Sequence, residues 1–466
     1  MAQSPTVEIP KRLPLLITPA SRDHTGTKDA KLVNCYMEIG PDGEPILVKR
    51  PGTSIYLGPF SGTGAGIYNW LGDIYSVFGT SFKKNGGTIG TVDGTGGVYH
   101  FSSCLGSTPK LQFGNGVFMY NYDASNGLVK VTDADFPAAF VKGFSYLDGT
   151  TYVMTVKAAI QGSAINDPTS WDPLNTITAQ IEPDQGVALA KQLVYTIAFK
   201  QWSTEVFYDA GNATGSPLAP VLGAKSNFGC YSSDSIQNVD GSLFWLATNR
   251  SAALCIMSMT SLVVAKVSTP CIERLMRNIP SSTIYSWQYK GNGHRFYIIT
   301  FTTANLTLAY DIDSGYWHQW TDTNGNYVPI TASSYISTTS TIVQHESDGN
   351  IYYISQIHFS DYTSGVPYSI PVDIYTPNYT GNTYRRKNLN RMDFVGDQVT
   401  GSVLNVRVSD DDYQTWSNFR QVDLGAADPN LTECGTFIKR AFNFRHTSNT
   451  ELRLKAVDLQ IDIGTL

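Results

Sequence analysis

The sequence predicts an all-β protein: a β-propeller with an extended N-terminal arm and a C-terminal antiparallel β-sandwich-like domain. Short apolar and aromatic runs alternate with Gly, Asn, Asp and Ser turns along most of the chain. Charged residues make up only 15% of the sequence, against about 25% in an ordinary domain. Aromatic residues reach 12%, and aromatic side chains suit the pleated surface of a sheet. Together these observations favour strands and tight turns over helices.

Residues 1–60 are predicted to form a Pro-rich extended arm. Proline recurs throughout this stretch, and it breaks regular elements because it lacks a backbone donor and fixes φ. Two apolar runs, LLI at 15–17 and KLVNCYME at 31–38, are suited to docking on other surfaces. The alternative interpretation of the stretch is a disordered tail.

Residues 61–360 are predicted to form the β-propeller. Apolar runs of four to eight residues bounded by turns are typical of strands. IYNWLGDIYSVF predicts a hairpin with its tight turn at Gly72–Asp73, and Asp148–Gly149 predicts another. Such hairpins, with few helices between them, indicate a propeller or a set of sandwiches. No clean period emerges, so the number of blades stays open.

One helix is predicted, over TPCIERLMRNIP at 269–280. Pro270 suits the first turn of a helix and Pro280 ends it. The apolar residues at i, i+3, i+4 and i+7 form one face that we expect to pack between blades: Ile272, Leu275, Met276 and Ile279.

Residues 361–466 are predicted to form a strand-rich docking domain, because longer strands there alternate between apolar and polar residues. The stretch SDDDYQTW, residues 409–416, joins two of them. It nearly matches a turn of glycan-cutting β-propeller enzymes, except that Tyr413 stands where that turn has Gly. Ser and Asp side chains bond turn backbone groups, so we interpret the stretch as a folding device rather than a mark of catalysis.

Composition limits the classes of function. A net charge of −6 and a pI near 5.6 argue against electrostatic binding of nucleic acid, although DNA that merely passes the protein is not excluded. The six cysteines have no metal-ligand spacing and are interpreted as reduced thiols. The N-terminus lacks a signal peptide, and the longest weakly polar run, 251–265, is too short for a membrane span. We therefore expect a soluble protein made in a reducing compartment.

No catalytic, cofactor-binding or metal site is predicted. The seven histidines are scattered, and neither the nucleophile elbow nor the phosphate-loop pattern occurs. A sialidase-like site needs several converging arginines, yet residues 51–249 contain none. The densest basic run is YRRK at 384–387. Its Arg385, Arg386 and Lys387 are candidates for docking an acidic partner or for touching DNA phosphates, and the alternative is a solvated surface charge.

Several stretches resemble one family. LVNCYMEIGPDGEPILVKRPGT (32–53), with Asn34 and Pro51–Gly52, is similar to the N-terminal signature of the tail-hub or nozzle proteins of short-tailed bacteriophages, also called packaged-DNA stabilisation proteins. Further similar stretches follow in order: 203–212, 256–279, 309–320, and the C-terminal pattern from SDDDYQTW through IKRAFNFR to ELRLKAVDLQID. The C-terminal part departs from the family in having Lys439, Arg440 and Phe442 where a Trp-Arg-Arg grouping is usual.

The resemblance implies a non-enzymatic structural subunit of the virion tail, assembled in the host bacterial cytoplasm. Six copies would form a ring below the tail adaptor ring, continue the DNA channel, retain the packaged genome and guide its ejection. The implied partners are the other copies of a homo-hexamer, the adaptor ring, tail fibres or spikes, a needle or plug protein, and viral DNA that passes without sequence recognition. The alternatives are a glycan-binding or glycan-cleaving propeller, for which the aromatic content and SDDDYQTW speak, and a fibre or spike, which would need a short solenoid period that this chain lacks.

Overall fold

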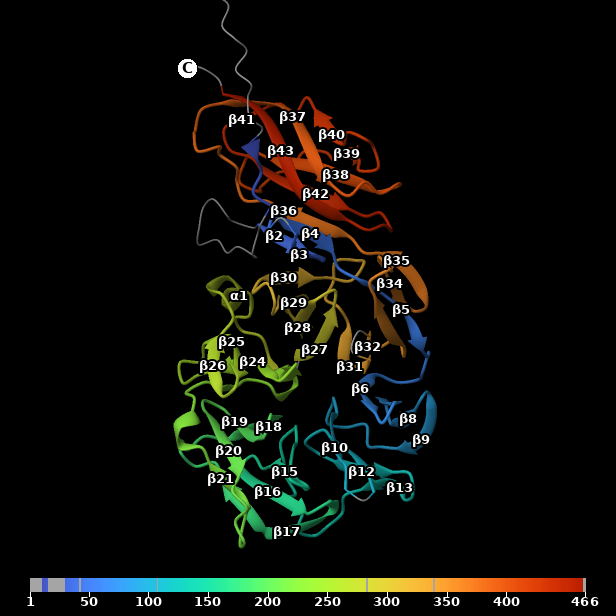
Figure 1. Cartoon of the computed structure of the whole chain (residues 1–466), viewed down its shortest axis with the longest axis vertical. Helices are drawn as coiled ribbons and strands as arrows, with labels where there is room; N and C mark the ends of the chain where they lie inside the picture. The colour runs from blue at the N-terminus through green and yellow to red at the C-terminus, as the bar shows by residue number, and fades with distance from the viewer. Residues whose placement is uncertain are drawn as a thin grey trace, which may run out of the picture.

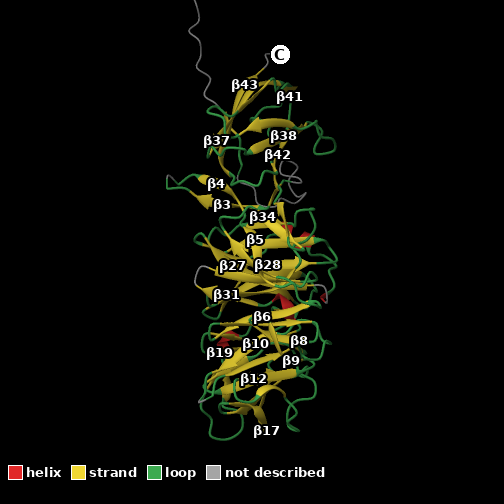
Figure 2. Ribbon diagram, turned by 90° about the vertical axis from the view of Figure 1, so that its right-hand side faces the viewer, coloured by secondary structure: helices red, strands yellow, loops and turns green. Residues whose placement is uncertain are grey.

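The computed structural model describes residues 11–15, 30–41, 43–106, 108–281, 284–337 and 340–463. These residues are almost entirely strands and turns, so the all-β prediction is confirmed. Figure 1 shows a ring of sheets, here called the propeller, and above it a smaller body of sheets, here called the sandwich. Figure 2, turned by 90°, shows the same two bodies stacked along the long axis of the molecule.

The propeller has seven blades in the part of the chain that the structure describes, each with at least four antiparallel strands. Six blades are built from strands that follow one another in sequence. They are β6 (Gly64–Trp70), β7 (Asp73–Phe78), β8 (Ser81–Lys84) and β9 (Gly87–Thr91); β10 (His100–Cys104), β11 (Lys110–Gly114), β12 (Met119–Asp123) and β13 (Gly127–Lys130); β14 (Ser145–Leu147), β15 (Thr150–Met154), β16 (Ala159–Ala164) and β17 (Asp167–Thr178); β18 (Gly186–Gln192), β19 (Tyr195–Lys200), β20 (Thr204–Asp209) and β21 (Leu218–Pro220); β22 (Gly229–Cys230), β23 (Gln237–Val239), β24 (Ser242–Thr248), β25 (Leu254–Thr260) and β26 (Val263–Lys266); and β27 (Ile284–Gly291), β28 (His294–Phe301), β29 (Leu306–Asp311) and β30 (Trp317–Trp320).

The seventh blade closes the ring with a strand from the other end of the chain. It consists of β31 (Ile330–Ser337), β32 (Ser340–His345), β33 (Ile351–Ser355) and β5 (Gly52–Leu57). The first strands of most neighbouring blades contact one another, and β31 contacts β6 of the first blade; the fifth blade instead meets its neighbours through the pairs β19–β22 and β23–β27. The Gln344 side chain fastens this last seam: it accepts from the Gly66 backbone N–H at 2.7 Å and donates to the Val77 carbonyl at 2.8 Å.

The hairpin turns follow the glycine and aspartate signals with one shift. Leu147 pairs with Thr150, so Asp148–Gly149 is a two-residue turn, as predicted, and both residues have positive φ. In the first blade Trp70 pairs with Asp73, which places the turn at Leu71–Gly72 rather than at the predicted Gly72–Asp73. The predicted turn was displaced by one residue because Asp73, and not the exposed Leu71, was taken as a turn position.

The sandwich is made of two sheet layers that combine both ends of the chain. One layer continues the sixth blade: β30 pairs in parallel with β2 (Lys31–Val33), and β36 (Val372–Tyr375), β42 (Ala441–His446), β38 (Val403–Ser409) and β39 (Arg420–Asp423) follow. The other layer contains β3 (Cys35–Ile39), β4 (Pro45–Lys49), β43 (Arg453–Ile463), β37 (Lys387–Gly396) and β40 (Asn430–Thr432), with β1 (Lys11–Arg12) on β43 and β41 (Thr436–Phe437) on β37. A hairpin of β34 (Ser360–Thr363) and β35 (Val366–Ser369) precedes β36.

Apolar side chains fill the space between the two layers of the sandwich and between neighbouring blades. Residues such as Leu32, Val406 and Val457 meet in one core. In the propeller the contacts join adjacent blades, as where Phe199 and Trp245 have ring centroids 5.0 Å apart. Burial of these faces is the main favourable term that holds each seam.

The predicted helix is shorter in the structure. The helix α1 spans Pro270–Leu275, with Pro270 in the first turn and the Thr269 side chain accepting from the Ile272 N–H. Ile272, Met276 and Ile279 are buried between the fifth and sixth blades, as expected, but Leu275 is 45% exposed. The apolar face is therefore one residue narrower than predicted. Two 3-10 turns, η1 (Leu222–Ala224) and η2 (Ser233–Ser235), lie in the fourth and fifth blades.

Most of the described residues of the predicted arm lie in strands. β1 to β4 belong to the sandwich and β5 belongs to the propeller, so the chain crosses from one body to the other near residue 50. The apolar run at 15–17 lies mostly outside the described residues. The division into units at residues 60 and 360 stays a prediction.

Candidate functional site at the junction of propeller and sandwich

Asn34 lies where the chain passes from β2 to β3, at the boundary between the two bodies. It has φ of +57° and is fully buried. Its side-chain amide donates to the Thr321 hydroxyl and to the Pro371 carbonyl, both at 2.8 Å, and its oxygen accepts from the Thr321 N–H at 2.8 Å. Asparagine tolerates this left-handed backbone better than most residues, and here one side chain joins the end of the sixth blade to the residue that precedes β36.

Arg50 completes this network. Its Nε donates to Asn34 Oδ1 at 2.8 Å, and its terminal nitrogens donate to the carbonyls of Thr321 (2.8 Å) and Pro51 (3.1 Å) and to the Asp361 carboxylate. The guanidinium carbon also lies 5.4 Å from the ring centre of Trp320. Only 3% of Arg50 is exposed. A buried arginine with its donors satisfied fixes geometry and is not free for chemistry or for docking.

Position 52, just after Arg50 and Pro51, has room only for glycine. A Cβ at this position would lie 2.2 Å from the Ser360 carbonyl oxygen and 2.9 Å from that of His358. The Gly52 N–H donates to the His358 carbonyl at 2.7 Å as β5 begins. The Asn34 and Pro51–Gly52 positions of the sequence signature therefore meet in space, and together they lock the closing strand of the propeller to the sandwich.

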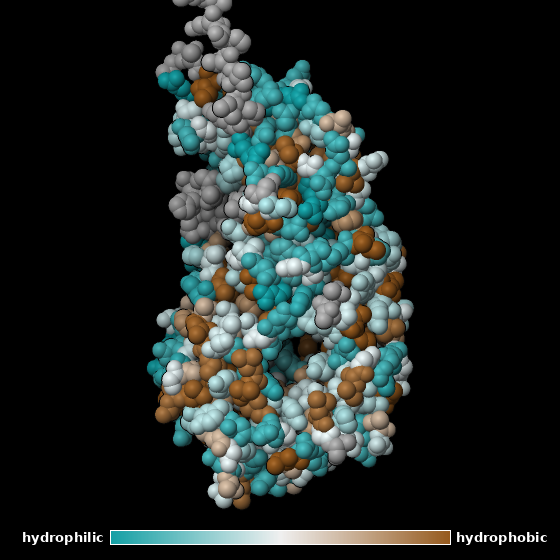
Figure 3. Space-filling view, viewed as in Figure 1, coloured by the Kyte–Doolittle hydropathy of each residue, from teal (hydrophilic) through white to brown (hydrophobic). Residues whose placement is uncertain are grey.

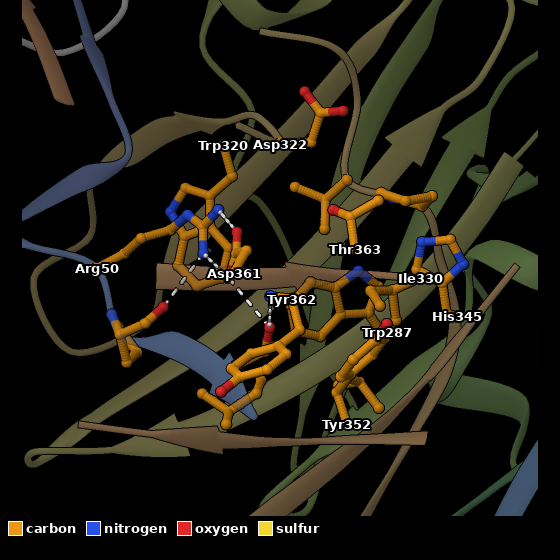
Figure 4. A pocket seen from close by; sticks show the side chains of 16 residues that line it. Arg50, Trp287, Trp320, Asp322, Ile330, His345, Tyr352, Asp361, Tyr362 and Thr363 are labelled. Carbon is orange, nitrogen blue, oxygen red and sulfur yellow. Dashed lines mark hydrogen bonds and ion pairs between the residues drawn. The ribbon is translucent and has the colours of Figure 1, made fainter. Parts of the chain in front are cut away.

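A cavity of about 70 Å³ opens beside this network (Figure 4). Trp287 lies at the centre of the view between Tyr362, Tyr352 and Ile330, and Trp320 lies against Arg50. Burial lowers the pKa of His345, which also borders the cavity. Nearby, burial and then the charge of Arg50 lower the pKa of Lys49 to about 7, and its ammonium donates to the Ser448 carbonyl at 2.8 Å.

A second polar cluster lies near the centre of the propeller. Asp234 accepts from His100 at 2.9 Å and from Lys142 at 2.8 Å, and these three residues come from the fifth, second and third blades. Burial alone would raise the pKa of Asp234, but the His100 hydrogen bond and the Lys142 charge hold it below its usual range. A cavity of about 180 Å³ lies beside the cluster, and Figure 3 shows a hollow near the centre of this face. The cluster links blades across the centre of the ring.

The SDDDYQTW turn is built from its own side chains. Asp411 accepts from the Thr415 hydroxyl at 2.5 Å, from the Thr415 N–H at 2.9 Å and from the Ser409 hydroxyl at 2.8 Å, and these bonds lower its pKa to about 2. Tyr413, in the glycine position, has φ of +65°, and its hydroxyl donates to the Thr376 carbonyl at 2.8 Å. These contacts describe a turn fastened to the sandwich core.

The three basic docking candidates separate in the structure. Arg385 and Arg386 are exposed beside the exposed ring of Tyr384. Lys387 is 1% exposed, and its ammonium donates to the carbonyls of Thr383, Arg385 and Ile438 at 2.7–2.8 Å. Its inclusion in a docking surface was therefore wrong, because alternation along β37 turns its side chain inward. Docking through Arg385 and Arg386 stays a prediction.

The sequence singled out Asn34 and Gly52 but not the residues that complete either site. Arg50 had one signal, since it directly precedes Pro51–Gly52 and the long stretch without arginine. Trp287 and Asp361 had none, and neither did the cluster around Asp234. Within the described ranges, no three His, Cys, Asp or Glu side chains lie close enough to hold a metal ion. No helix in that part of the chain is long and apolar enough to cross a membrane.

The seven-bladed ring, closed by an N-terminal strand and joined to a sandwich, defines a β-propeller protein with an appended strand domain. Residues 35–357 match the phage-stabilisation family described as bacteriophage P22 Gp10, β-propeller. The chain belongs to this family and is a bacteriophage tail protein of the class that stabilises packaged DNA. The predicted family is thereby confirmed.

Other comparisons add little. No curated protein matches. Solved structures with similar folds include the extracellular domain of a hybrid two component system from B. thetaiotaomicron (TM-score 0.44, 10% identity, 66% of this chain and 41% of that chain). They also include an inactive virginiamycin B lyase from Staphylococcus aureus (TM-score 0.39, 8% identity, 72% of this chain and 97% of that chain). YCF48 bound to D1 peptide is similar at the same level (TM-score 0.39, 12% identity, 66% of this chain and 98% of that chain). All three TM-scores lie below 0.5, so none of these likenesses bears on function.

Proposed function

We propose that this chain is a structural, non-enzymatic subunit of a short phage tail, in which six copies form a nozzle ring below the adaptor ring. The ring continues the DNA channel, retains the packaged genome and guides its ejection, and it docks fibres or spikes. The observation that carries the proposal is the family match over residues 35–357, which spans most of the propeller. The protein acts in the virion tail after assembly in the host bacterial cytoplasm.

The path of DNA in this proposal runs along the axis of the hexamer and not through a propeller. His100, Lys142 and Asp234 meet across the centre of each propeller at hydrogen-bond distances, which leaves no room there for a duplex. A net charge of −6 also suits a conduit, because each phosphate neutralised by a basic wall would add affinity through counterion release. Retention of the genome is then steric, by a narrow aperture or by a needle or plug protein.

Electron microscopy of the purified protein and of virions tests the proposal. We expect six-fold rings in solution or on an adaptor template, and a density of this fold in the tail below the adaptor. Native mass spectrometry gives the subunit count independently. A protein that is strictly monomeric and absent from particles would contradict the proposal.

Docking of an acidic partner through Arg385 and Arg386 is part of the same proposal. A double substitution R385E/R386E would weaken binding of a fibre, spike or plug protein to the assembled ring. K157E, at an exposed lysine of the propeller, is the matched control. Equal binding by wild type and the double variant would remove these two arginines from the interface.

The alternative function is a glycan-binding or glycan-cleaving propeller. The SDDDYQTW turn motivates it, because the turn keeps the side-chain bonds described above. Incubation with host surface polysaccharide, followed by measurement of new reducing ends and of bound protein, decides the point. Absence of both binding and cleavage would end this alternative.

A further inference from the structure

The cavity at the junction has a buried aromatic floor and a half-exposed mouth. Trp287, Trp320, Val343 and Tyr352 are each no more than 2% exposed and form the floor, and the mouth includes the exposed Thr363. Its walls come from the sixth and seventh blades and from β34, so a guest here would contact three separate parts of the fold. Its 70 Å³ exceeds the roughly 10–15 Å³ that one water molecule needs.

Two hydrogen-bond donors on the floor have no acceptor. The indole nitrogens of Trp287 and Trp320 are buried and make no hydrogen bond. Other buried indoles donate to backbone carbonyls: Trp245 donates to Gly229 at 3.0 Å and Trp171 donates to Pro168 at 3.0 Å, although Trp70 in the first blade also lacks an acceptor. An unsatisfied buried donor costs about 1–3 kcal/mol, so this cavity favours a guest that brings an acceptor.

The cavity offers little to a guest that brings a donor. The Asp361 oxygens already accept from Arg50 and from the Thr53 hydroxyl. His345 Nδ1 accepts from two backbone N–H groups, which leaves Nε2 as a further donor. The Arg50–Asp361 pair balances its own charge. The Asp322 carboxylate also borders the cavity, and its Oδ1 accepts from two backbone N–H groups. The floor itself carries no charge, so it suits a neutral ligand. A compact apolar group with a carbonyl and no N–H meets all of these conditions.

We infer that this cavity is a binding site for a tertiary amide: a small apolar ring or branched group that carries a carbonyl oxygen and no donor. A prolyl residue in an extended segment has this chemistry, because proline lacks the backbone N–H and presents a flat ring to aromatic walls. Free small tertiary amides share it. The carbonyl accepts from an indole N–H of the floor, and the ring packs among the four aromatic side chains Trp287, Trp320, Tyr352 and Tyr362.

The indole N–H signals report binding directly. Protein labelled with ¹⁵N-tryptophan is titrated with N-acetylproline dimethylamide and, as the control probe, with N-acetylalanine methylamide, which carries two donors. We expect the signals of Trp287 and Trp320, assigned from Trp→Phe variants, to move on addition of the prolyl probe at concentrations up to ~10 mM, a range that detects dissociation constants near 1 mM. The other indole signals stay in place.

Peptide probes separate the two sources of the ligand. A peptide with the sequence of residues 1–10, MAQSPTVEIP, is compared with the same peptide in which both prolines are alanine. Tighter binding of the proline peptide than of the small amide assigns the site to a prolyl segment of a neighbouring chain. Binding of the small amide without the peptide assigns it to a free ligand, and both results support a tertiary-amide site.

Two substitutions on one hairpin make the test specific. T363F fills the mouth of the cavity, and V366F places the same ring on its cross-strand partner, which does not line the cavity. We expect T363F to weaken binding at least about tenfold and V366F to leave it within about twofold. W320F, which keeps an aromatic ring and removes one donor, gives a second route to the same loss should T363F fail to fold.

The inference is overturned if neither indole signal moves with any probe, if the alanine probe moves them equally, or if T363F and W320F bind as wild type does. A high-resolution structure with only ordered water in the cavity at saturating probe would overturn it as well. These results are independent of ring assembly, so a six-fold ring without amide binding would leave the proposed function standing.

Discussion

The propeller and the sandwich are assembled in opposite ways. Six of the seven blades fold from one continuous stretch each, and nearly all of their strands pair with the next strand in sequence; the exception is β22, which pairs with β24. The sandwich instead joins β1 to β4 with strands that follow residue 371, so its layers form only when the two ends of the chain meet. Local pairing closes short loops, whereas the sandwich must close loops of several hundred residues. The strand β5 connects the two bodies: it follows β4 of the sandwich in the chain, and it pairs with β33, a strand distant in sequence, to complete the seventh blade.

The two bodies also differ in what they bury. The sandwich core is a single apolar cluster. Its buried lysines, Lys49 and Lys387, donate to backbone carbonyls. In the propeller the fully buried Lys200 pairs with carboxylates instead: its ammonium lies 2.9 Å from Asp184 and 2.6 Å from Glu205. The Lys200 cluster lies within the fourth blade, on β19, β20 and the chain that leads into β18. Removal of a cation that pairs with two buried carboxylates should destabilise the protein more than removal of a partly exposed one.

The largest effect is expected for K200M. Removing the ammonium leaves two buried carboxylates without their shared cation, so we expect the free energy of unfolding to fall by about 3–5 kcal/mol. Chemical denaturation followed by intrinsic fluorescence measures the change. The matched control is K225M, whose partner Glu182 is partly exposed and whose loss should cost about 1 kcal/mol or less. Equal losses for both variants would show that burial does not set the strength of these pairs.

G52A tests β5, the strand that closes the propeller and follows directly on the sandwich strand β4. The added Cβ meets the backbone of Ser360 and His358, so the start of β5 must shift, and we expect a loss of about 3 kcal/mol. Hydrogen exchange should rise along β5 and β33 while β42 and β43 stay protected. G223A, at a glycine with open space around its Cβ position, is the control. Uniform loss of protection in both bodies would mean that propeller closure and sandwich formation are one cooperative event.

Acid should destabilise both bodies, and the two histidines whose pKa values are lowered most lie one in each body. Burial lowers the pKa of His318 in the sixth blade to about 4, and burial and then the charge of Lys49 lower that of His446 in the sandwich to about 3. Both folded pKa values lie below the ordinary 6.5, so the stabilising effect is fully present above pH 6.5 and is lost as pH falls toward 4 and 3. Each group contributes about 1.4 kcal/mol per pH unit in that window.

Substitution separates the two contributions. We expect H318F and H446Q each to flatten the dependence of unfolding free energy on pH between about 6.5 and 4.5, a change of roughly 2.7 kcal/mol over the two units. H294Q should act in the opposite direction. Burial alone would lower the pKa of His294, but its 2.7 Å bond to Asp311 raises it, so that stability is present below pH 6.5 and lost as pH rises. If the dependence of unfolding free energy on pH is the same in H318F as in wild type, the His318 imidazole takes up its proton without unfolding of the protein.

The sequence predicted the propeller better than it predicted the sandwich, for a physical reason. Turn residues such as Asp148–Gly149 act within a few residues, so they reveal hairpins and, through their recurrence, blades. Gly52 donates its N–H to the His358 carbonyl, and Asn34 bonds to Thr321, and no local pattern specifies such pairs. Prolines 41, 45 and 51 indicated an extended arm. A strand that pairs only with strands distant in sequence has the same local pattern as an extended arm, so the sequence alone does not distinguish the two.

The candidate site was predictable only in part. The family-like signature located Asn34 and Gly52, which lie in the junction, but the aromatic floor of the cavity comes from strands that pattern alone marks only as apolar. Lys387 shows the opposite error, because the sequence marked it as a functional surface residue and the structure buries it. Its charge suggested a surface, yet alternation in β37 places it inward among three carbonyls. Periodicity over the longer stretch KNLNRMDFVG would have given the correct side.

The smallest expected effect concerns the turn at residues 409–416, in the sandwich. Tyr413 occupies a left-handed position that favours glycine, so its side chain must offset that strain. Its hydroxyl donates to the Thr376 carbonyl, and its ring lies 6.0 Å from the ring of Trp416. Y413F keeps the ring and removes the hydrogen bond, and we expect a loss of about 1 kcal/mol.

The matched control is Y208F, at a tyrosine of the propeller that is 41% exposed, where we expect a change within about 0.5 kcal/mol. Thermal denaturation of both variants beside wild type measures the difference. If Y413F is no less stable than Y208F, the hydroxyl does not hold the turn to the core, and the bonds that Asp411 accepts from Ser409 and Thr415 are sufficient on their own. The turn would then be a self-contained unit like a blade hairpin, although it lies in the body that is otherwise assembled from distant strands.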